Sequence, residues 1–427
     1  MTTSARSVAL EAVRRVTEHD AYSSIVVRTL LKRSALDDRD RSLATNLAFG
    51  TLRRLRTLDF VIEARASRPL ARMSNGALAT LRLGAYQLRY TNVPPHAAVS
   101  ESVDLAAHRE RGFVNAVLRR LAADPPALPE GPSDEDVAIR TGLNPWAVAE
   151  LRHIIGDEAE NAAEAIAERA SLCLRVNTCR TSLEELTRAL GAAGHELVPA
   201  SIDRECLTLP SGDPARLPGF EEGWFAVQDQ ASTFVVRTLD PRPGERILDV
   251  CAAPGGKAAM AACLVQPDGR VVAADVRVER TALIRQTATR LGVSIHAVAQ
   301  DARAPAVRSL FDGVLVDAPC SGIGSARRRP ELLWRPRKED LSALARLQVA
   351  IASKAADSVR PGGRLIYSVC TFPRAETDAA CDAILRHRPD LEPLEFEGPD
   401  GRARRVRLWP HRHGSDGMFV AAFRRRE

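Results

Sequence analysis

The sequence predicts a multidomain protein: an all-α N-terminal part, a small α+β subdomain, and an α/β domain with a Rossmann-like sheet. Three observations predict this organisation. The chain has 427 residues, more than one hydrophobic core usually organises. Apolar residues recur at helical spacing in the first part of the chain. In the last part, apolar runs alternate with helical segments, which is typical of a parallel sheet covered by helices.

The helical part extends from Ser4 to about Ala123, where apolar residues such as Val8, Ala12 and Val16 share one helix face. A break follows over Asp124–Asp136, whose four prolines, one glycine and five acidic residues do not continue a helix. Helical spacing returns over residues 144–170. We therefore expect a helical domain at residues 1–124 and a linker with further helices at 125–170.

The remaining chain divides into a small and a large part. LCLRVNT and CLTLP are typical of short strands, and they flank a helix over residues 182–191, so we expect an α+β subdomain at 171–230. The α/β domain is expected at 231–427. Its five buried parallel strands are predicted in RILDVCA, RVVAADV, HAVAQDA, GVLVDAP and GRLIYSV. The tail adds VRLWP and GMFVAAF, which we expect to close the sheet as a final pair.

Composition narrows the class of protein. The hydrophobic fraction of 45% and the charged fraction of 27% are near globular averages and argue against a largely disordered or fibrous chain. The formal charge of +6 is compatible with a polyanionic partner. The first residues lack the apolar core of a signal peptide, and no run approaches the length of a membrane span. We expect a monomer in the cytoplasm with no membrane contact.

The eight cysteines form no CxxC pair and no Cys/His cluster at zinc spacing. This pattern indicates neither a disulfide framework nor a metal site, so we expect reduced thiols and no bound metal. Most of the cysteines have no neighbouring polar motif and are interpreted as inert packing residues; these are Cys173, Cys179, Cys206, Cys263 and Cys381.

A candidate ligand-binding turn lies at the end of the first apolar run. DVCAAPGGKAA, residues 249–259, is predicted to leave a strand through Pro254, Gly255 and Gly256 and to enter a helix. Glycines in such a turn let the backbone approach a ligand closely. No GxGxxG is present, and a phosphate-binding P-loop requires glycine at Cys251 and Ser or Thr at Ala258. The turn therefore favours a ligand other than a nucleotide phosphate.

Carboxylates follow the next strands. Asp275 ends the second run, about 20 residues beyond the turn, where a carboxylate can accept hydrogen bonds from both ribose hydroxyls. Asp301 ends the third run and either meets the exocyclic amine of an adenine or caps the next turn. Because open α/β sheets bind ligands at the carboxyl ends of their strands, these residues together with Asp249 predict an adenosine site.

Two cysteines end the fourth and fifth runs, Cys320 in DAPCSGIG and Cys370 in YSVCT. This arrangement suits methylation of cytosine C5, a carbon too weakly nucleophilic to take a methyl group from a sulfonium directly. A thiolate must first add to C6, and a base must later remove the C5 proton so that the thiolate can leave. Asp317 is placed to bind the N3 and amino edge of the base, and the second cysteine to assist release.

DVCAAPGGK, DAPCSGIGSARRRPELLW, YSVCT and HGSDGMF resemble motifs of the NOL1/NOP2/Sun family of RNA cytosine-5 methyltransferases. The resemblance implies that Cys370 is the nucleophile and Cys320 the release cysteine. DNA cytosine-5 enzymes use the two positions in reverse, so Cys320 is the alternative nucleophile. Val369 departs from the Thr or similar small residue that usually precedes the cysteine in the family.

The same resemblance implies an S-adenosyl-L-methionine pocket, with Lys257 near the site of methyl transfer. The pocket residues are Cys251, Ala252, Ala253, Pro254, Gly255, Gly256, Lys257, Asp275, Asp301 and Asp317. Five residues after Cys320 are candidates for gripping phosphates around a splayed-out base, or else for a solvated basic loop. They are Arg327, Arg328, Arg329, Trp334 and Arg335.

The N-terminal half resembles the NusB-type RNA-binding domain in DRSLATNLAFGTLR, LRLGAYQLRYTNVPPHAAVSESVDLA and GFVNAVLRRL. RVN at 175–177 and QDQAS at 228–232 match the small subdomain that precedes the family's catalytic fold. This arrangement is similar to that of bacterial enzymes that methylate 16S rRNA, which implies 16S rRNA or a small-subunit precursor as partner. Whether the helical domain touches RNA stays open. The alternatives are the same chemistry on tRNA or another RNA, and a non-catalytic ribosome-assembly factor.

Overall fold

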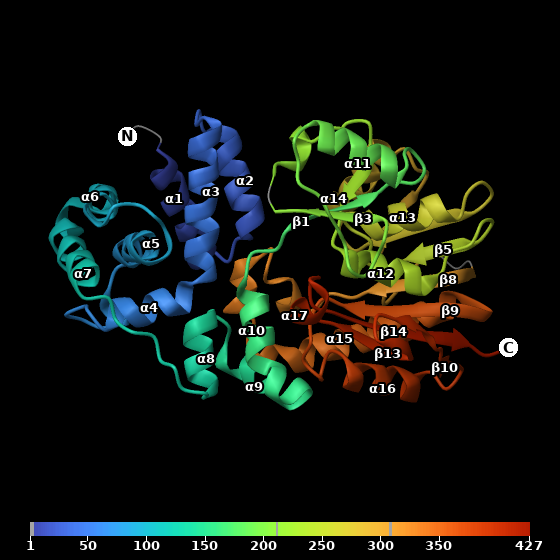
Figure 1. Ribbon diagram of the computed structural model, residues 1–427. Helices are drawn as coiled ribbons and strands as arrows, with labels where there is room; N and C mark the ends of the chain where they lie inside the picture. The colour runs from blue at the N-terminus through green and yellow to red at the C-terminus, as the bar shows by residue number, and fades with distance from the viewer. Residues whose placement is uncertain (1–3, 211, 307–309) are drawn as a thin grey trace. The chain divides into compact units, whose positions relative to one another are not determined.

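The computed structural model describes residues 4–210, 212–306 and 310–427, which fold into two units (Figure 1). The first unit comprises Met1–Glu168 and Ala326–Pro336, and the second comprises Arg169–Ser325 and Arg337–Glu427. Residues 1–3, which the first predicted domain includes, lie outside the described residues. The segment Ala326–Pro336, which the sequence predicts within the α/β domain, packs instead with the first unit.

The first unit is helical, as the apolar spacing predicts. Its helices are α1 (Ala5–Glu18), α2 (Ser23–Arg33), α3 (Asp38–Arg53), α4 (Leu55–Glu63), α5 (Asn75–Tyr90), α6 (Pro95–Leu105), α7 (Arg111–Ala123), α8 (Asp134–Thr141), α9 (Pro145–Ile155) and α10 (Ala159–Ala167). Short polar side chains accept hydrogen bonds from the first turns of several helices, including Ser4 at α1, Asp37 at α3 and Ser74 at α5.

Helix α8 corrects one boundary of the predicted break. The sequence predicts a non-helical segment through Asp136, but the helix already begins at Asp134. Ser133 accepts a hydrogen bond from the amide of Asp136 at 3.1 Å. Acidic side chains in a first turn interact favourably with the positive end of the helix dipole. The three acids at 134–136 therefore start a helix, and only the proline-rich part of the segment is a break.

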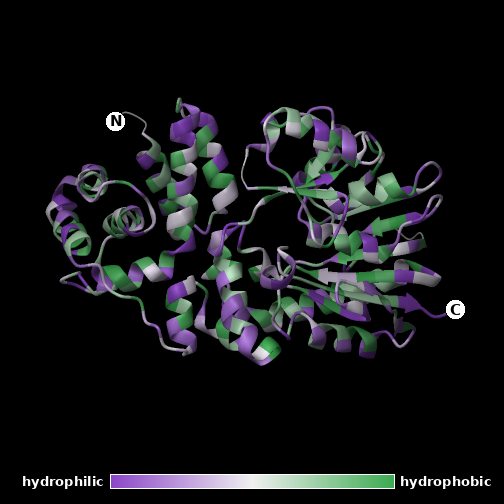
Figure 2. Ribbon diagram, viewed as in Figure 1, coloured by the Kyte–Doolittle hydropathy of each residue, from purple (hydrophilic) through white to green (hydrophobic). Residues whose placement is uncertain are grey.

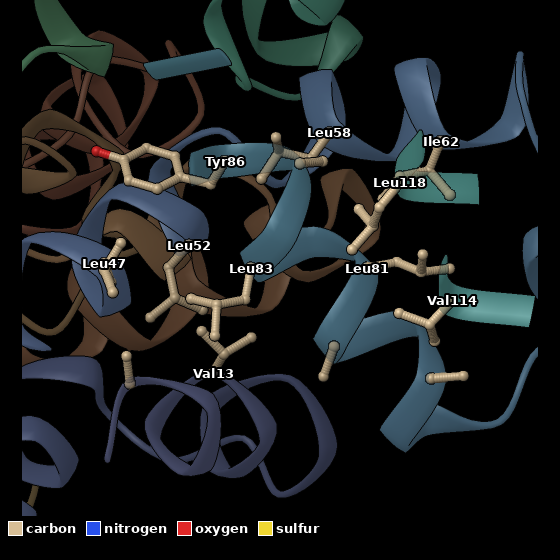
Figure 3. Close-up of a cluster of buried hydrophobic side chains, with 14 of the residues drawn as sticks. Val13, Leu47, Leu52, Leu58, Ile62, Leu81, Leu83, Tyr86, Val114 and Leu118 are labelled. Carbon is tan, nitrogen blue, oxygen red and sulfur yellow. The ribbon is translucent and has the colours of Figure 1, made fainter. Parts of the chain in front are cut away.

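Helix α5 is at the centre of the first unit's core. It packs against α1, α3, α4, α6 and α7. Its buried Leu81, Leu83 and Tyr86 lie among side chains of the surrounding helices, such as Val13 and Leu118 (Figure 3). Figure 2 shows hydrophobic and hydrophilic residues along the same helices, the pattern of helices with one buried face.

The second unit begins with a small antiparallel sheet of strand order β2-β3-β1-β4. Its strands are β1 (Leu172–Val176), β2 (Val198–Pro199), β3 (Cys206–Leu209) and β4 (Phe225–Val227). Helix α11 (Leu183–Ala192) contributes Leu186 and Leu190 to the core of this subdomain. The two strands and the helix that the sequence predicts in this part of the chain are confirmed.

A larger sheet follows, with order β10-β14-β9-β8-β5-β6-β7 and β13 paired to β14 in the described residues. Strands β5 to β9 are mutually parallel in this order, whereas β14 is antiparallel to both β9 and β13. The predicted closing pair is therefore confirmed. The strands are β5 (Arg246–Asp249), β6 (Arg270–Asp275), β7 (His296–Ala299), β8 (Phe311–Asp317), β9 (Val359–Val369), β10 (Leu391–Pro393), β13 (Arg405–Leu408) and β14 (Met418–Arg425).

Helices cover both faces of this sheet (Figure 1). Because side chains alternate along a strand, Ile247 of β5 packs in the core with α12 and α13, and Leu248 packs on the opposite face with α15 and α16. The helices are α12 (Gln230–Leu239), α13 (Gly256–Leu264), α14 (Val278–Leu291), α15 (Leu341–Ala355), α16 (Asp378–His387) and α17 (Pro410–His413), and β11 (Phe396–Gly398) pairs with β12 (Gly401–Ala403). Within the described residues, no helix combines the length and apolar character needed to span a membrane.

Candidate active site

The candidate site lies where the strand order of the large sheet reverses. The chain passes from β5 outward through β6 and β7, and then returns to add β8 on the other side of β5. At such a reversal the loops after neighbouring strands diverge and leave a crevice at the carboxyl ends of the strands. Asp249 ends β5, Asp275 ends β6 and Asp317 ends β8. The three predicted carboxylates therefore come to the same edge of the sheet.

Asp249 is the most enclosed of these carboxylates, with 1% of its surface exposed. Burial, followed by repulsion from Asp317, raises the pKa of Asp249 to about 7, although Lys257 and the amide of Cys251 counteract the shift. The amide nitrogen of Cys251 donates to its Oδ1 at 3.3 Å. The carboxyl thus holds the start of the glycine turn and is poised to change charge near neutral pH.

Gly255 shapes the turn between β5 and α13. Its φ of +106° lies in the left-handed region, and a Cβ at this position would lie 3.1 Å from the Cα of Ile284. A side chain at position 255 is therefore disfavoured both by the positive φ and by the closeness of Ile284. The turn is closed by a hydrogen bond from Gly255 N to Ala252 O at 2.7 Å. Because α13 starts directly afterwards, Lys257 occupies its first turn.

Lys257 forms an ion pair with Asp317, with 2.7 Å between Nζ and Oδ2. Ser368 of β9 donates to Oδ1 of the same carboxylate at 2.9 Å, and Ser232 of α12 lies 3.5 Å from Nζ. Burial opposes protonation of the lysine, but attraction to Asp317 outweighs it and holds the pKa of Lys257 above its ordinary value. The site therefore keeps a fixed positive charge at its centre.

The two strand-end cysteines are adjacent. The Sγ atoms of Cys320, after β8, and Cys370, after β9, lie 3.4 Å apart. A hydrogen bond to Cys370, followed by burial and the charges of Glu376 and Asp317, raises the pKa of Cys320 well above the ordinary value. Cys320 accordingly keeps its proton at neutral pH, and its sulfur is within hydrogen-bonding distance of that of Cys370. Burial likewise raises the pKa of Cys251, so that thiol is also protonated.

Backbone hydrogen bonds join the loops around the cysteines. Gly324 N donates to Cys370 O at 3.0 Å, and Gly417 N donates to Gly324 O at 2.8 Å. A Cβ on Gly324 would lie 2.1 Å from Gly417 O, so the loops approach this closely only because the residue is glycine. The amide of Asp416 also donates to Asp229 Oδ1 at 3.0 Å. The HGSDGMF segment is therefore a structural support of the cysteine loops.

The predicted adenosine residues differ in their environments. Asp275 is buried and accepts hydrogen bonds from the amides of Ala253 at 3.4 Å and Arg277 at 3.3 Å. Asp301 is more exposed, and hydrogen bonds from the side chain and amide of Arg303 lower its pKa. Asp301 thus makes the turn-capping bonds that the sequence allows as its alternative role, and its contact with adenine stays a prediction.

Two of the five predicted RNA-contacting residues are engaged within the first unit. Trp334 Nε1 donates to Leu52 O at 3.0 Å. Arg335 donates to the carbonyl oxygens of Val16 at 2.9 Å and Ala21 at 3.0 Å. Both side chains therefore anchor the segment Ala326–Pro336 to helices of the unit. Arg327, Arg328 and Arg329 are half-buried, and RNA contact by this segment stays a prediction.

The segment Ala326–Pro336 is held by further contacts within the first unit. Glu331 is fully buried and accepts hydrogen bonds from Ser23, at 2.6 Å from its Oγ and 3.3 Å from its amide. Arg53 also donates to Arg327 O at 2.9 Å. No local sequence pattern indicates these pairs, because more than 270 positions separate their members. They explain why the segment packs with the helical unit.

Ser368 is a site residue that sequence reasoning overlooked, although a pattern could have identified it. It lies two positions before Cys370, and residues two apart in a strand point to the same face of the sheet. Its hydroxyl is bonded to Asp317. The alternation of side chains along the strand that leads to Cys370 therefore predicts that Ser368 faces the site together with Cys370.

The cysteines outside the site require one correction. The structure contains a disulfide between Cys179 and Cys263, with 5.8 Å between their Cα atoms. The expectation of reduced, inert thiols was therefore wrong for this pair. Cys179 follows β1 and Cys263 lies in α13, 84 positions later, so only the packing of the small subdomain on the large one brings them together. Cys173, Cys206 and Cys381 are buried and lie outside this disulfide.

Comparisons with known families cover most of the chain. The model described as 16S rRNA methyltransferase RsmB/F matches residues 236–424, and the NusB family model matches residues 3–123. A model described as the Methyltr_RsmF/B-like, ferredoxin-like domain matches residues 144–215. The first two matches correspond to the sheet domain and the helical domain, and the third extends from α9 and α10 into the small subdomain.

Individual relatives extend the similarity to the whole chain. A probable ribosomal RNA small subunit methyltransferase B of Bacillus subtilis is 34% identical over 449 aligned positions, covering 99% of each chain. The putative methyltransferase Rv1407 of Mycobacterium tuberculosis is 38% identical, covering 99% of this chain and 96% of its own. The crystal structure of PH0851 superposes with a TM-score of 0.83 at 25% identity over 99% of both chains. This chain therefore belongs to the RsmB/F family of 16S rRNA methyltransferases.

Proposed function

We propose that the chain transfers a methyl group from S-adenosyl-L-methionine to C5 of a cytosine in 16S rRNA through a covalent bond between a cysteine and C6. The observation that carries the proposal is the pair of sulfur atoms 3.4 Å apart beside the Lys257–Asp317 ion pair. A methylation at nitrogen or oxygen requires no thiol. Two adjacent thiols are expected where one forms a covalent bond to a base carbon and the other serves its release.

Cys370 is the proposed nucleophile. Attack by its thiolate forms the bond between Sγ and C6 and shifts an electron pair to C5, which then takes the methyl group. The raised pKa of Cys320 supports this assignment, because a thiol that keeps its proton is a poor nucleophile. Cys320 is assigned to assist the release step, in which a base takes the C5 proton, the electrons of that bond form the C5–C6 double bond, and Cys370 leaves C6 as a thiolate.

Lys257 and Asp317 have supporting roles. The positive charge of Lys257 offsets the negative charge that attack develops on the base, and its pair with Asp317 fixes its position. Asp317 in turn is the carboxylate assigned to the N3 and amino edge of cytosine. Its Oδ1 is already oriented by Ser368, which restricts the carboxylate to one arrangement.

The residues at the strand ends fit S-adenosyl-L-methionine, which supplies an electrophilic methyl group when bound. Asp275 offers a buried carboxylate to the ribose hydroxyls. Val276 and Val278 beside it are 62% and 63% exposed, and such apolar surface suits an adenine ring. Gly255 adds no side chain to the turn at residues 251–257, where a Cβ would lie 3.1 Å from the Cα of Ile284. Asp249 lies next to that turn and holds it through the amide of Cys251.

The proposal is tested by incubating the protein with radiolabelled S-adenosyl-L-methionine and small-subunit RNA, followed by bisulfite sequencing. We expect 5-methylcytosine at a discrete position of 16S rRNA. Transfer of label to nitrogen or oxygen, or to tRNA alone, would contradict the proposal. No transfer to any RNA by folded protein would favour the non-catalytic assembly factor.

The roles of the two cysteines are tested by trapping the covalent complex on denaturing gels. Cys370→Ala is expected to form no RNA adduct, whereas Cys320→Ala is expected to accumulate one because release is impaired. Cys381→Ala is the matched control, since that thiol is buried in packing outside the site. Adduct formation by Cys370→Ala and none by Cys320→Ala would exchange the two roles.

A further inference from the structure

A buried carboxylate connects the two loops that carry the cysteines. Glu376 lies between β9 and α16 and has no exposed surface. Its Oε1 accepts a hydrogen bond from the amide of Ser321 at 2.9 Å, and its Oε2 accepts from the Ser321 hydroxyl at 2.5 Å. The hydroxyls of Ser321 and Thr371 are 2.7 Å apart. Ser321 follows Cys320 and Thr371 follows Cys370, so this cluster holds the residue after each cysteine.

Gln348 of α15 extends the cluster to the other side of Cys320. Its Nε2 donates to Pro319 O at 3.0 Å and to Glu376 Oε1 at 2.9 Å. Pro319 and Ser321 are the two chain neighbours of Cys320, and both are thus held by the pair of Gln348 and Glu376. The Tyr367 hydroxyl donates to Glu376 O at 2.6 Å and fixes the backbone of Glu376 to β9.

Burying the carboxylate of Glu376 costs solvation free energy unless the carboxylate accepts hydrogen bonds. Burial raises its pKa above the ordinary value, while the hydrogen bonds from Ser321, Gln348 and Thr371 act in the opposite direction. A buried carboxylate without such donors would lose several kcal/mol of solvation. The donors and the carboxylate are therefore mutually dependent, and the cluster has one arrangement in which all of them are satisfied.

From this geometry we propose that Glu376 is a positioning residue that sets the separation of the Cys320 and Cys370 sulfur atoms. Its side chain is fully buried, so it acts through Ser321 and Thr371. The inference rests on the proposed function, because the separation of the sulfurs matters for catalysis only if both thiols take part. During attack the cytosine must lie close to one thiol, and during release close to the other. A shift of either loop therefore slows turnover but leaves the surfaces that bind S-adenosyl-L-methionine and RNA in place.

The test compares Glu376→Gln with the parent in the full chain. Glutamine has nearly the same shape, but its amide nitrogen cannot accept the Ser321 hydroxyl. A displacement of reacting groups by about 1 Å can cost on the order of 100-fold in rate. We expect kcat to fall by that order while KM for S-adenosyl-L-methionine and for RNA stays within about twofold. Glu245→Gln is the matched control, because Glu245 is a partly buried carboxylate that pairs with Arg364 in the middle of β9, outside the Glu376 cluster.

Two further variants keep the inference falsifiable if Glu376→Gln does not fold. Ser321→Ala and Thr371→Val each remove one partner and are expected to lower kcat with unchanged KM. The double variant of Ser321→Ala and Glu376→Gln should lose little more than the more affected single variant, because both act through one contact. Unchanged kcat in all of the folded variants would overturn the inference. A rise in KM as large as the fall in kcat would also overturn it. Absence of any adduct or 5-methylcytosine with the parent chain would instead overturn the proposed function.

Discussion

The amide nitrogen of Gly324 donates a hydrogen bond to the carbonyl oxygen of Cys370, 3.0 Å away. This bond runs from the loop that follows the proposed release cysteine directly to the residue proposed as nucleophile. It depends on the close approach of Gly417, which bonds to the carbonyl of Gly324. Backbone contacts that only glycine permits thus contribute to the relative placement of the two cysteine loops.

Replacing Gly324 with alanine is expected to separate these loops. The added Cβ would lie 2.1 Å from Gly417 O, and overpacking of this kind typically costs about 1–3 kcal/mol of folding free energy. We expect a large fall in kcat, measured by methyl transfer, with only this modest loss of folding free energy, measured by urea unfolding. Gly112→Ala on α7 is the control, because its Cβ would meet nothing within 4 Å. Full activity of Gly324→Ala would show that the close approach is dispensable.

Lys257→Met removes the cation that balances Asp317 and Asp249. Breaking a fully buried ion pair by deleting one partner costs roughly 3–5 kcal/mol, and this partly buried pair should cost less than that. We therefore expect a loss of stability in thermal unfolding, and a loss of methyl transfer that Lys257→Arg only partly restores, because guanidinium and ammonium place their donors differently. The double variant Lys257→Met, Asp317→Leu should regain stability but not activity. A stable and active Lys257→Met would exclude the ion pair as an essential feature.

The pH dependence of stability is expected to change in Asp249→Asn. The pKa of Asp249 rises from 3.8 to about 7 on folding, so its contribution to stability is fully present below pH 3.8 and is lost as the pH rises toward 7. The parent should lose stability relative to the variant by about 1.4 kcal/mol per pH unit up to pH 7, with no further change above about pH 8. Urea unfolding between pH 5.5 and 8.5 measures this difference.

Asp312→Asn provides the comparison for that experiment. Burial opposes ionisation of Asp312, but hydrogen bonds from Arg246 and Arg360 hold its pKa below the ordinary value. Its contribution is therefore lost only in acid below pH 3.8, and the difference from the parent should be constant from pH 5.5 to 8.5. A constant difference for Asp249→Asn as well would mean that its carboxyl is ionised throughout.

Ser23→Ala is expected to loosen the segment Ala326–Pro336. It leaves the fully buried Glu331 carboxylate without its hydroxyl donor, and an unsatisfied buried polar group costs about 1–3 kcal/mol. Hydrogen exchange should speed up in peptides from α2 and residues 326–336 and stay unchanged in those from the large sheet. Glu339→Gln, an exposed position, is the control. Unchanged exchange in the segment would show that Trp334 and Arg335 hold it without Ser23.

The Cys179–Cys263 disulfide is expected to stabilise the second unit. A crosslink of this kind typically contributes about 2–4 kcal/mol, chiefly by restricting the unfolded chain. Dithiothreitol should lower the melting temperature of the parent and leave that of Cys179→Ser, Cys263→Ser unchanged. Peptide mapping after alkylation should recover the two cysteines joined. Two alkylated thiols in the unreduced protein would contradict the bond.

The sequence by itself determined the succession of elements and the strand ends of the site. The apolar runs before Asp249, Asp275, Asp317 and Cys370 predict buried parallel strands, and parallel strands bring their carboxyl ends to one edge. Periodicity is a local property, so these features follow from short windows of sequence. The same reasoning did not identify β10, β11 and β12, because strands of three residues are too short to show a period.

Only the tertiary structure decided which distant residues meet. Glu331 bonds to Ser23 and Cys179 to Cys263 across separations that leave no local pattern, and Glu376 reaches Ser321 across 55 positions. Each of these contacts exists because separate elements are packed to a fixed distance, which depends on the volumes of many intervening side chains. The sequence thus determined which thiols stand at the strand ends, and the packing of the loops determined that their sulfur atoms lie 3.4 Å apart.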